Sequence, residues 1–272
     1  MIQDYLYRAW AYIRHLFTSW NTGGEGIHSP YLFYLVRLII RDDNHYYSWA
    51  AIEQRREAML RAPKLVALTD YGTGGQKHSN GTADCKRLVS DIARSSLTPR
   101  TDAQVFFRIV NWLSHEAQRP LHIVELGTNL GITTAYLAAP DSRNTVITYE
   151  GSHSLVEMAQ LNWRKLNLNN IRVVEGNIDD TLMPQDLPTI DLAYIDANHR
   201  YTPTLHYFDT LKQVSHSKTI IIIDDIHHNP EMERAWRTIC QQKEVTSTMD
   251  FFHFGLVFFD PHYLHRHYRL RC

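Results

Sequence analysis

The sequence predicts an α/β fold in which helices cover both faces of a doubly wound, mostly parallel sheet. From about residue 101 onward, short β-branched segments alternate with longer segments of helical periodicity, as in chains that build parallel sheets. Residues 220–223 are consecutive isoleucines, which fits a central strand buried on both faces. The last two predicted strands leave no room for a helix between them, so they predict a closing antiparallel hairpin.

Each element is predicted from its own pattern of apolar residues. Seven strands are predicted at residues 121–126, 145–150, 170–175, 190–195, 218–224, 245–249 and 254–259. Helices are predicted at residues 101–117, 131–139, 153–167, 202–214 and 230–241. The expected fold is a seven-stranded sheet that ends in an antiparallel pair of strands.

The first hundred residues differ from the rest in being rich in aromatic residues. Apolar residues recur at helical spacing from Ile2 to Trp20, and further helices are predicted at residues 30–40 and 49–60. We therefore expect a helical N-terminal extension with a glycine-rich loop at residues 1–100 and a second domain at residues 101–272. The extension is expected to serve as a substrate lid or in dimerisation, since a homodimer would bury Trp10 and Trp20.

Composition excludes several classes of protein. Of the 272 residues, 44% are hydrophobic and 21% are charged, so the chain can bury a sizeable core. The formal net charge is -1, which disfavours a protein held to nucleic acid mainly by phosphate contacts. Cys85, Cys240 and Cys272 lie far apart, which argues against a disulfide framework and fits a reducing, cytoplasmic environment. The longest apolar segments, at residues 31–36 and 219–223, are too short to cross a bilayer.

The most informative segment follows the first predicted strand of the second domain. That strand ends at Glu125 and leads through the turn Gly127–Gly131 into a helix. Gly127 lets the backbone turn tightly and approach a ligand, and Gly131 lets the helix begin against the strand. The dinucleotide fingerprint G-x-G-x-x-G is absent, because Asn129 occupies the second glycine position. This difference argues against a nicotinamide dinucleotide.

A second acidic residue, Glu150, ends the next strand about 20 residues beyond the glycine turn. A carboxylate at that position can accept hydrogen bonds from both hydroxyls of a ribose. The glycine turn alone is a weak signal, but the turn together with Glu150 is a strong one. The pair predicts a site for a nucleoside-containing cofactor.

These motifs, together with residues 174–177 and 194–196, resemble the successive motifs of class I S-adenosylmethionine-dependent methyltransferases. The resemblance covers roughly residues 100–260 and implies a Rossmann-like sheet with a C-terminal antiparallel hairpin. It implies that the glycine loop contacts the methionine part of the cofactor, that Glu150 holds the ribose, and that Asn177 and Ile178 lie beside the adenine. The full set of implied cofactor residues is Glu125, Gly127, Thr128, Asn129, Gly131, Glu150, Gly151, Asn177, Ile178 and Asp196.

Within that superfamily the chain is most similar to the catechol and caffeoyl-CoA O-methyltransferase branch and its bacterial relatives. The D-x-x-H-x-Y pattern of those relatives corresponds to residues 196–201, and Asp224 and Asp225 correspond to their following acidic pair. Asp196, Asp224 and Asp225 end adjacent predicted strands, so their carboxylates are expected to meet at one edge of the sheet. Such oxygen ligands favour Mg²⁺ or another divalent cation, which would bind the hydroxyl of a small acceptor and lower its pKa.

His199 stands where plant and animal enzymes of this branch have a lysine general base. An imidazole can accept a hydroxyl proton at neutral pH, so we predict His199 and Asp196 as catalytic residues of an O-methyltransferase. One alternative is a metal-independent methyltransferase that uses His199 on a small molecule or a tRNA base. Another is a catalytically silent module that binds the cofactor and interacts through its aromatic N-terminal helices.

Overall fold

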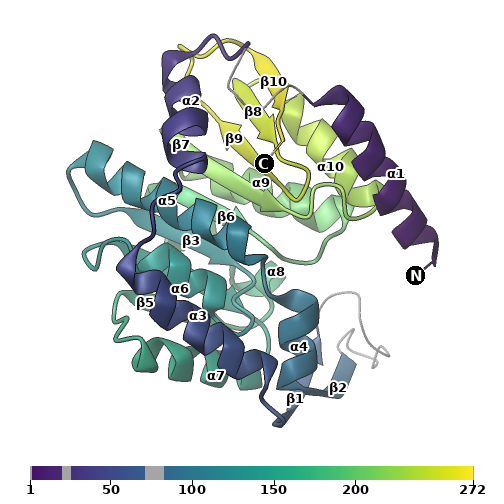
Figure 1. The fold of residues 1–272 in the computed structure, drawn as a ribbon, viewed down its shortest axis with the longest axis vertical. Coiled ribbons are helices and arrows are strands. Elements are labelled where there is room, and N and C mark those ends of the chain that lie inside the picture. The colour runs from purple at the N-terminus through teal and green to yellow at the C-terminus, as the bar shows by residue number, and fades with distance from the viewer. Residues whose placement is uncertain (1, 20–25, 71–82, 272) are drawn as a thin grey trace. The chain divides into compact units, whose positions relative to one another are not determined.

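The computed structural model describes residues 2–19, 26–70 and 83–271 (Figure 1). The chain divides into two compact units: residues 1–41 with 183–272 form unit 1, and residues 42–182 form unit 2. The expected division into an N-terminal extension and a second domain at residue 100 stays a prediction. No helix of the described residues is long and apolar enough to cross a membrane.

Unit 2 carries the glycine turn on three parallel strands of the larger sheet, which has eight strands in all. The order within this unit is β3-β4-β5, and the strands span His122–Leu126, Thr145–Glu150 and Ile171–Glu175. Its helices are α3 (Tyr47–Leu60), α4 (Val89–Ser96), α5 (Arg100–Ala117), α6 (Ile132–Ala138), α7 (His153–Lys165) and α8 (Ile178–Thr181). A separate antiparallel pair joins β1 (Leu65–Asp70) to β2 (Ala83–Leu88).

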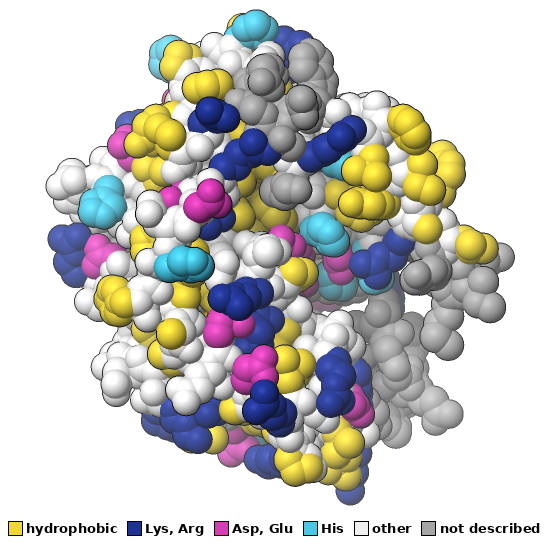
Figure 2. All heavy atoms as spheres, viewed as in Figure 1, with side chains coloured by type: hydrophobic (Ala, Val, Ile, Leu, Met, Phe, Trp, Pro, Cys, Tyr) yellow, Lys and Arg dark blue, Asp and Glu magenta, His cyan; other side chains and the backbone are white. Residues whose placement is uncertain are grey.

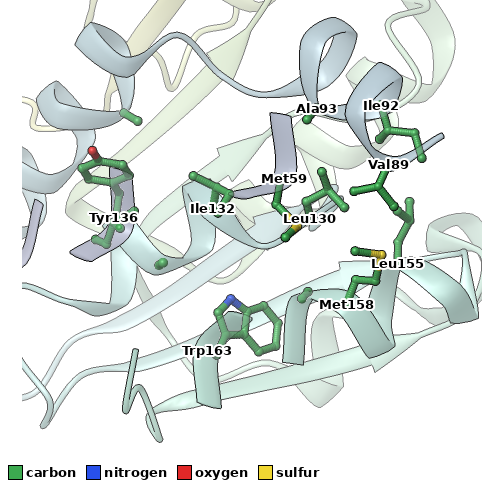
Figure 3. Packing of buried hydrophobic residues seen from close by; sticks show 14 of the residues in the cluster. Met59, Val89, Ile92, Ala93, Leu130, Ile132, Tyr136, Leu155, Met158 and Trp163 are labelled. Carbon is green, nitrogen blue, oxygen red and sulfur yellow. The ribbon is translucent and has the colours of Figure 1, made fainter. Parts of the chain in front are cut away.

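The core of unit 2 packs directly beneath the glycine turn. Leu130 and Ile132, on either side of Gly131, are fully buried among apolar side chains of α3, α4 and α7. Figure 3 shows these two residues between Met59 of α3 and Met158 and Trp163 of α7. The hydrophobic core of unit 2 therefore supports the turn.

Unit 1 contains the remaining five strands of the larger sheet, in the order β10-β8-β9-β7-β6. They span Ile190–Ile195 (β6), Ser215–Asp224 (β7), Ser247–Asp250 (β8), Phe254–Phe258 (β9) and Arg266–Arg269 (β10). β9 runs antiparallel to both β7 and β8, whereas β6 and β7 are parallel. The helices are α1 (Ile2–Thr18), α2 (Pro30–Tyr34), the π-helix η1 (Leu35–Ile40), the 3-10 helix η2 (Pro184–Asp186), α9 (Tyr201–Gln213) and α10 (Pro230–Cys240).

The α/β prediction and the closing antiparallel hairpin are confirmed. The seven predicted strands correspond to β3–β9 within a few residues at each end. The sheet has an eighth strand, β10, which pairs parallel with β8 and was not predicted. Residues 65–70 form β1, and most of the glycine-rich segment that follows lies outside the described residues.

Candidate functional site

The glycine turn after β3 is fixed to the end of β4 by backbone hydrogen bonds. The N–H groups of Gly127 and Thr128 both donate to the carbonyl of Tyr149, at 3.0 and 3.1 Å. Gly127 has a φ of 99°, in the left-handed region that disfavours side chains. The predicted need for glycine at this position agrees with its conformation.

Gly131 is required for close packing against α7, whereas the sequence predicted that it lets a helix begin against a strand. Its φ is 72°, and a Cβ placed on it would lie 2.6 Å from Nε1 of Trp163 and 2.8 Å from Cβ of Ala159. The Trp163 Nε1–H donates to the Gly131 carbonyl at 2.8 Å. Gly131 thus allows α7 to approach the turn, whereas sequence reasoning assigned its small size to packing between helix and strand.

Glu125 lies in the interior of unit 2. Its side chain is fully buried, and its Oε2 accepts hydrogen bonds from the hydroxyls of Thr134 at 2.5 Å and Thr148 at 2.6 Å. Thr148 also shares a hydrogen bond of 2.6 Å with the hydroxyl of Thr128 in the turn. These contacts connect Glu125 to the start of α6 and, through Thr148, to the glycine turn.

Glu150 lies at the tip of β4 with its carboxylate held by two backbone amides. Its Oε2 accepts from the Asn129 N–H at 2.8 Å, and its Oε1 accepts from the Ser152 N–H at 2.9 Å. The side chain is only half-buried. A carboxylate oxygen has two lone pairs and can accept more than one hydrogen bond, so these contacts with backbone amides are compatible with binding of a ligand hydroxyl.

The predicted adenine segment begins beside the same strand end. The Gly176 N–H donates to the Glu150 carbonyl at 2.9 Å, which places Asn177 and Ile178 just after this contact. Asn177 caps α8 by accepting from the Asp179 N–H at 3.3 Å. Gly151, Asn177 and Ile178 are all partly exposed, so unit 2 brings the predicted cofactor residues other than Asp196 to the ends of β3, β4 and β5.

In unit 1, the hydroxyl of Tyr194 links two of the predicted carboxylates. It donates to Oδ2 of Asp196 at 3.2 Å and to Oδ2 of Asp224 at 2.9 Å. Tyr194 lies on β6 and Asp196 follows directly after its last residue, Ile195, so the two side chains are two apart along an extended chain and point to the same side. Sequence reasoning did not assign this role to Tyr194, although the spacing of two residues is the signal that indicates it.

His199 lies between two carboxylates. Its Nε2 is 3.4 Å from Oδ1 of Asp196, and its Nδ1 is 4.0 Å from Oδ2 of Asp225. Asp225 also pairs with Nδ1 of His228 at 3.2 Å, and the rings of the two histidines stack with centroids 5.7 Å apart. Asn198, His199 and Asp225 all have positive φ, a costly conformation that concentrates at functional sites.

The carboxyl groups of Asp196 and Asp225 have pKa values shifted in opposite directions. Burial raises the pKa of Asp196 to about 6, and the charge of Asp225 adds to this effect while His199 opposes it. Burial also acts to raise the pKa of Asp225, but His228 and His199 outweigh it and hold that pKa below its ordinary value. Asp225 is therefore the carboxylate whose negative charge the two imidazoles stabilise.

The three aspartates have the right ligand chemistry for Mg²⁺ but do not converge on one point. Asp196 and Asp224 share the hydroxyl of Tyr194, whereas Asp225 pairs with histidines. Among the described residues, the set of three whose ligand atoms all lie within 4.8 Å of one another is His15, His227 and Asp250. The geometry therefore does not fit a cation bound by all three predicted ligands, and we derive no step through one.

An apolar stripe is exposed on α1. Leu6, Trp10, Ile13 and Phe17 lie on one face of the helix, and Phe17 is 86% exposed. Figure 2 shows hydrophobic side chains gathered over this helix. Trp20 lies outside the described residues, and burial of Trp10 in a homodimer stays a prediction.

Comparison with known proteins finds a match for the central part of the chain. Residues 124–226 match a family model described as a methyltransferase domain. This range begins within β3 and ends just after β7, so it contains all of the predicted site residues. No curated protein matches the chain significantly.

Solved structures share the fold at low sequence identity. The O-methyltransferase from Bacillus cereus in complex with S-adenosylhomocysteine is 18% identical, with a TM-score of 0.55 over 81% of this chain and 94% of that one. The S-adenosylhomocysteine-bound methyltransferase PaMTH1 from Podospora anserina is 11% identical, with a TM-score of 0.56 over 81% and 92%. TomG, an O-methyltransferase from Streptomyces achromogenes involved in tomaymycin synthesis and solved with S-adenosylmethionine, is 15% identical, with a TM-score of 0.51 over 60% and 82%.

Proposed function

We propose that this chain, a class I methyltransferase by its motifs, fold and matched domain, transfers a methyl group from S-adenosylmethionine to a hydroxyl oxygen of a small acceptor. The observation that carries the proposal is the Glu150 carboxylate, which two backbone amides hold beside the glycine turn. In that position it is ready to accept the two ribose hydroxyls of the cofactor.

The glycine turn supplies the other half of the proposed cofactor site. Gly127 leaves its backbone open to the methionine part of the cofactor, because a side chain is disfavoured at its φ. Asn177 and Ile178 follow the strand end beside Glu150, which supports their assignment to the adenine. Three solved proteins of the same fold contain S-adenosylmethionine or S-adenosylhomocysteine, which supports the same choice of cofactor.

His199 is the proposed general base. In the reaction, an acceptor oxygen forms a bond to the methyl carbon, the bond between that carbon and the sulfonium sulfur breaks, and S-adenosylhomocysteine leaves. The hydroxyl proton passes to an imidazole nitrogen of His199. Asp196 and Asp225, 3.4 and 4.0 Å from its two nitrogens, would stabilise the imidazolium that results.

Asp224 and Tyr194 are proposed to position Asp196. The hydroxyl of Tyr194 is hydrogen-bonded to both carboxylates, so it fixes the orientation of Asp196 toward His199. Assistance by a divalent cation at Asp196, Asp224 and Asp225 stays a prediction from the sequence. The observed pairing of Asp225 with His199 and His228 favours the metal-independent alternative.

Substitution of His199 tests the role of this residue. The full-length chain is incubated with S-adenosylmethionine labelled in its methyl group and a panel of small hydroxylated compounds, and methylated products are counted. We expect His199→Gln to lower kcat roughly 100-fold or more while leaving the affinity for S-adenosylhomocysteine unchanged. His206→Gln, on the exposed face of α9, is the matched control and should behave as the wild type.

Three outcomes would contradict the proposal. If His199→Gln retains full activity on an accepted compound, His199 is not the base. If the wild type binds S-adenosylhomocysteine but methylates no hydroxylated compound, while tRNA becomes methylated, the acceptor class is wrong. Binding without any transfer would favour the silent cofactor-binding module.

A further inference from the structure

Three buried side chains that methyl transfer does not use meet inside unit 1. His15 comes from α1, His227 from the loop after β7, and Asp250 from the end of β8. Each is between 4% and 6% exposed. Two imidazoles and a carboxylate buried together form a polar cluster that needs a compensating charge or proton.

The distances within this cluster match those between ligands of one metal ion. Nε2 of His227 is 2.9 Å from Oδ2 of Asp250, and Nδ1 of His15 is 3.4 Å from Oδ1 of the same carboxylate. Two ligands bound at about 2.0–2.1 Å in a tetrahedral Zn²⁺ site lie roughly 3.3 Å apart. The two distances to Asp250 lie on either side of this spacing, and the ligand atoms of all three side chains lie within 4.8 Å of one another.

Each histidine turns one ring nitrogen toward the Asp250 carboxylate and the other toward an outer contact. Nε2 of His15 lies 3.1 Å from the Leu270 carbonyl, so it carries the proton and leaves a lone pair on Nδ1. Nε2 of His227 donates a hydrogen bond to Asp250 at 2.9 Å, and a cation would displace this proton, with the Glu233 carboxylate 3.8 Å from Nδ1 on the outer side of the ring. Metal-binding histidines are typically oriented in this way by a carbonyl or a carboxylate.

The inward Nδ1 of His15 also lacks any hydrogen-bond partner. The Asp250 carboxylate faces both imidazoles, and the Glu233 carboxylate lies 3.8 Å from the outer nitrogen of His227. The cluster therefore attracts positive charge, which either a proton or a cation can supply.

We propose that His15, His227 and Asp250 form a Zn²⁺ site, separate from the predicted site at Asp196, Asp224 and Asp225. Imidazole nitrogens with one carboxylate favour Zn²⁺ over Mg²⁺, which prefers oxygen ligands. A cavity of about 190 Å³ borders His227 and Asp250 and has room for a water as fourth ligand. The ion would hold α1 against β8 and fix the loop that carries His228.

Metal binding to the full-length chain tests this proposal. The protein is stripped with a chelator and titrated with Zn²⁺ by calorimetry, and Co²⁺ is then added as a spectroscopic substitute. We expect one Zn²⁺ per chain, visible absorption bands of tetrahedral Co²⁺, and a melting temperature raised by roughly 5–10 °C at saturating Zn²⁺. His15→Gln, His227→Gln and Asp250→Asn should each weaken Zn²⁺ binding at least tenfold.

The controls separate this site from other histidines and aspartates. His262→Gln removes an exposed histidine that pairs with Asp260 at 2.8 Å, and it should leave Zn²⁺ binding intact. Asp225→Asn should also leave it intact. The proposal is overturned if the wild type binds no Zn²⁺, in which case a proton neutralises the cluster. It is equally overturned if a folded His15→Gln variant, checked by circular dichroism, binds Zn²⁺ as tightly as the wild type.

Discussion

The carboxylate of Glu150 accepts a hydrogen bond from the backbone N–H of Asn129 at 2.8 Å. This contact joins the tip of β4 to the glycine turn that follows β3, two points 21 residues apart in the sequence. The negative charge is thereby oriented before any ligand binds, which reduces the cost of ordering the site when the cofactor arrives.

Replacement of Glu150 should weaken cofactor binding. Glu150→Gln keeps the size of the side chain but removes its negative charge. It also replaces one acceptor oxygen with an NH2 group, which cannot accept a hydrogen bond from a ligand hydroxyl or a backbone N–H. Hydrogen bonds to a charged group contribute about 1.5–3 kcal/mol, so we expect S-adenosylhomocysteine to bind roughly 10- to 100-fold more weakly by calorimetry. Glu175→Gln, at the paired position on β5, is the control and should change the affinity less than twofold.

Gly131→Ala should destabilise unit 2. The added methyl group would lie 2.6 Å from Trp163 and 2.8 Å from Ala159, at a φ that disfavours alanine. Strain of the backbone and overpacking together should lower the free energy of unfolding by roughly 2–4 kcal/mol. Chemical denaturation measures this change, and a loss below about 0.5 kcal/mol would show that α7 does not pack against the turn as described.

Mg²⁺ should leave turnover unchanged. The protein is dialysed against EDTA and reloaded with Zn²⁺, so that the proposed site at His15 is filled, and kcat is measured with and without Mg²⁺. Because Asp225 pairs with His199 and His228, we expect no stimulation. Stimulation that Asp225→Asn abolishes would instead establish the divalent cation predicted from the sequence, with the aspartates rearranged around it.

The thiol of Cys240 should resist alkylation. Burial raises its pKa to about 12, which the contact with Thr248 only partly offsets. At pH 8.5 the folded chain should hold roughly a thousandfold less thiolate at Cys240 than the unfolded chain. The neutral thiol is favoured in the folded state, so its contribution to stability is lost as the pH rises above about 8.5. Iodoacetamide labelling followed by peptide mass spectrometry checks this, and rates within tenfold of those in urea would contradict it.

Most of the strands could be predicted because they are buried and their sequences are therefore rich in apolar residues. β6 is apolar and buried at residues 192–195, and β7 is apolar and buried at residues 220–223. The segment between these strands has helical periodicity. β10 could not be found in this way because its sequence is Arg266-His267-Tyr268-Arg269. Charged side chains are usual on an edge strand, and here only Tyr268 is buried.

The site was predictable where function depends on residues near one another in the sequence. The glycine turn and Glu150 belong to one strand-helix-strand unit, so their spacing already indicates their proximity. The contacts of Asp225 depend on the positive φ values of His199 and of Asp225 itself, which no residue pattern indicates. His15 and the Leu270 carbonyl are 255 positions apart, so only the folded chain shows that they meet.

Titration of the full-length chain with S-adenosylhomocysteine by calorimetry tests the central claim most directly. The wild type should bind one molecule per chain, and Gly127→Asp should abolish binding because the new side chain is strained at this φ and brings a negative charge to the turn. Absence of binding to the wild type, or the same affinity for Gly127→Asp, would contradict the assignment of the cofactor site.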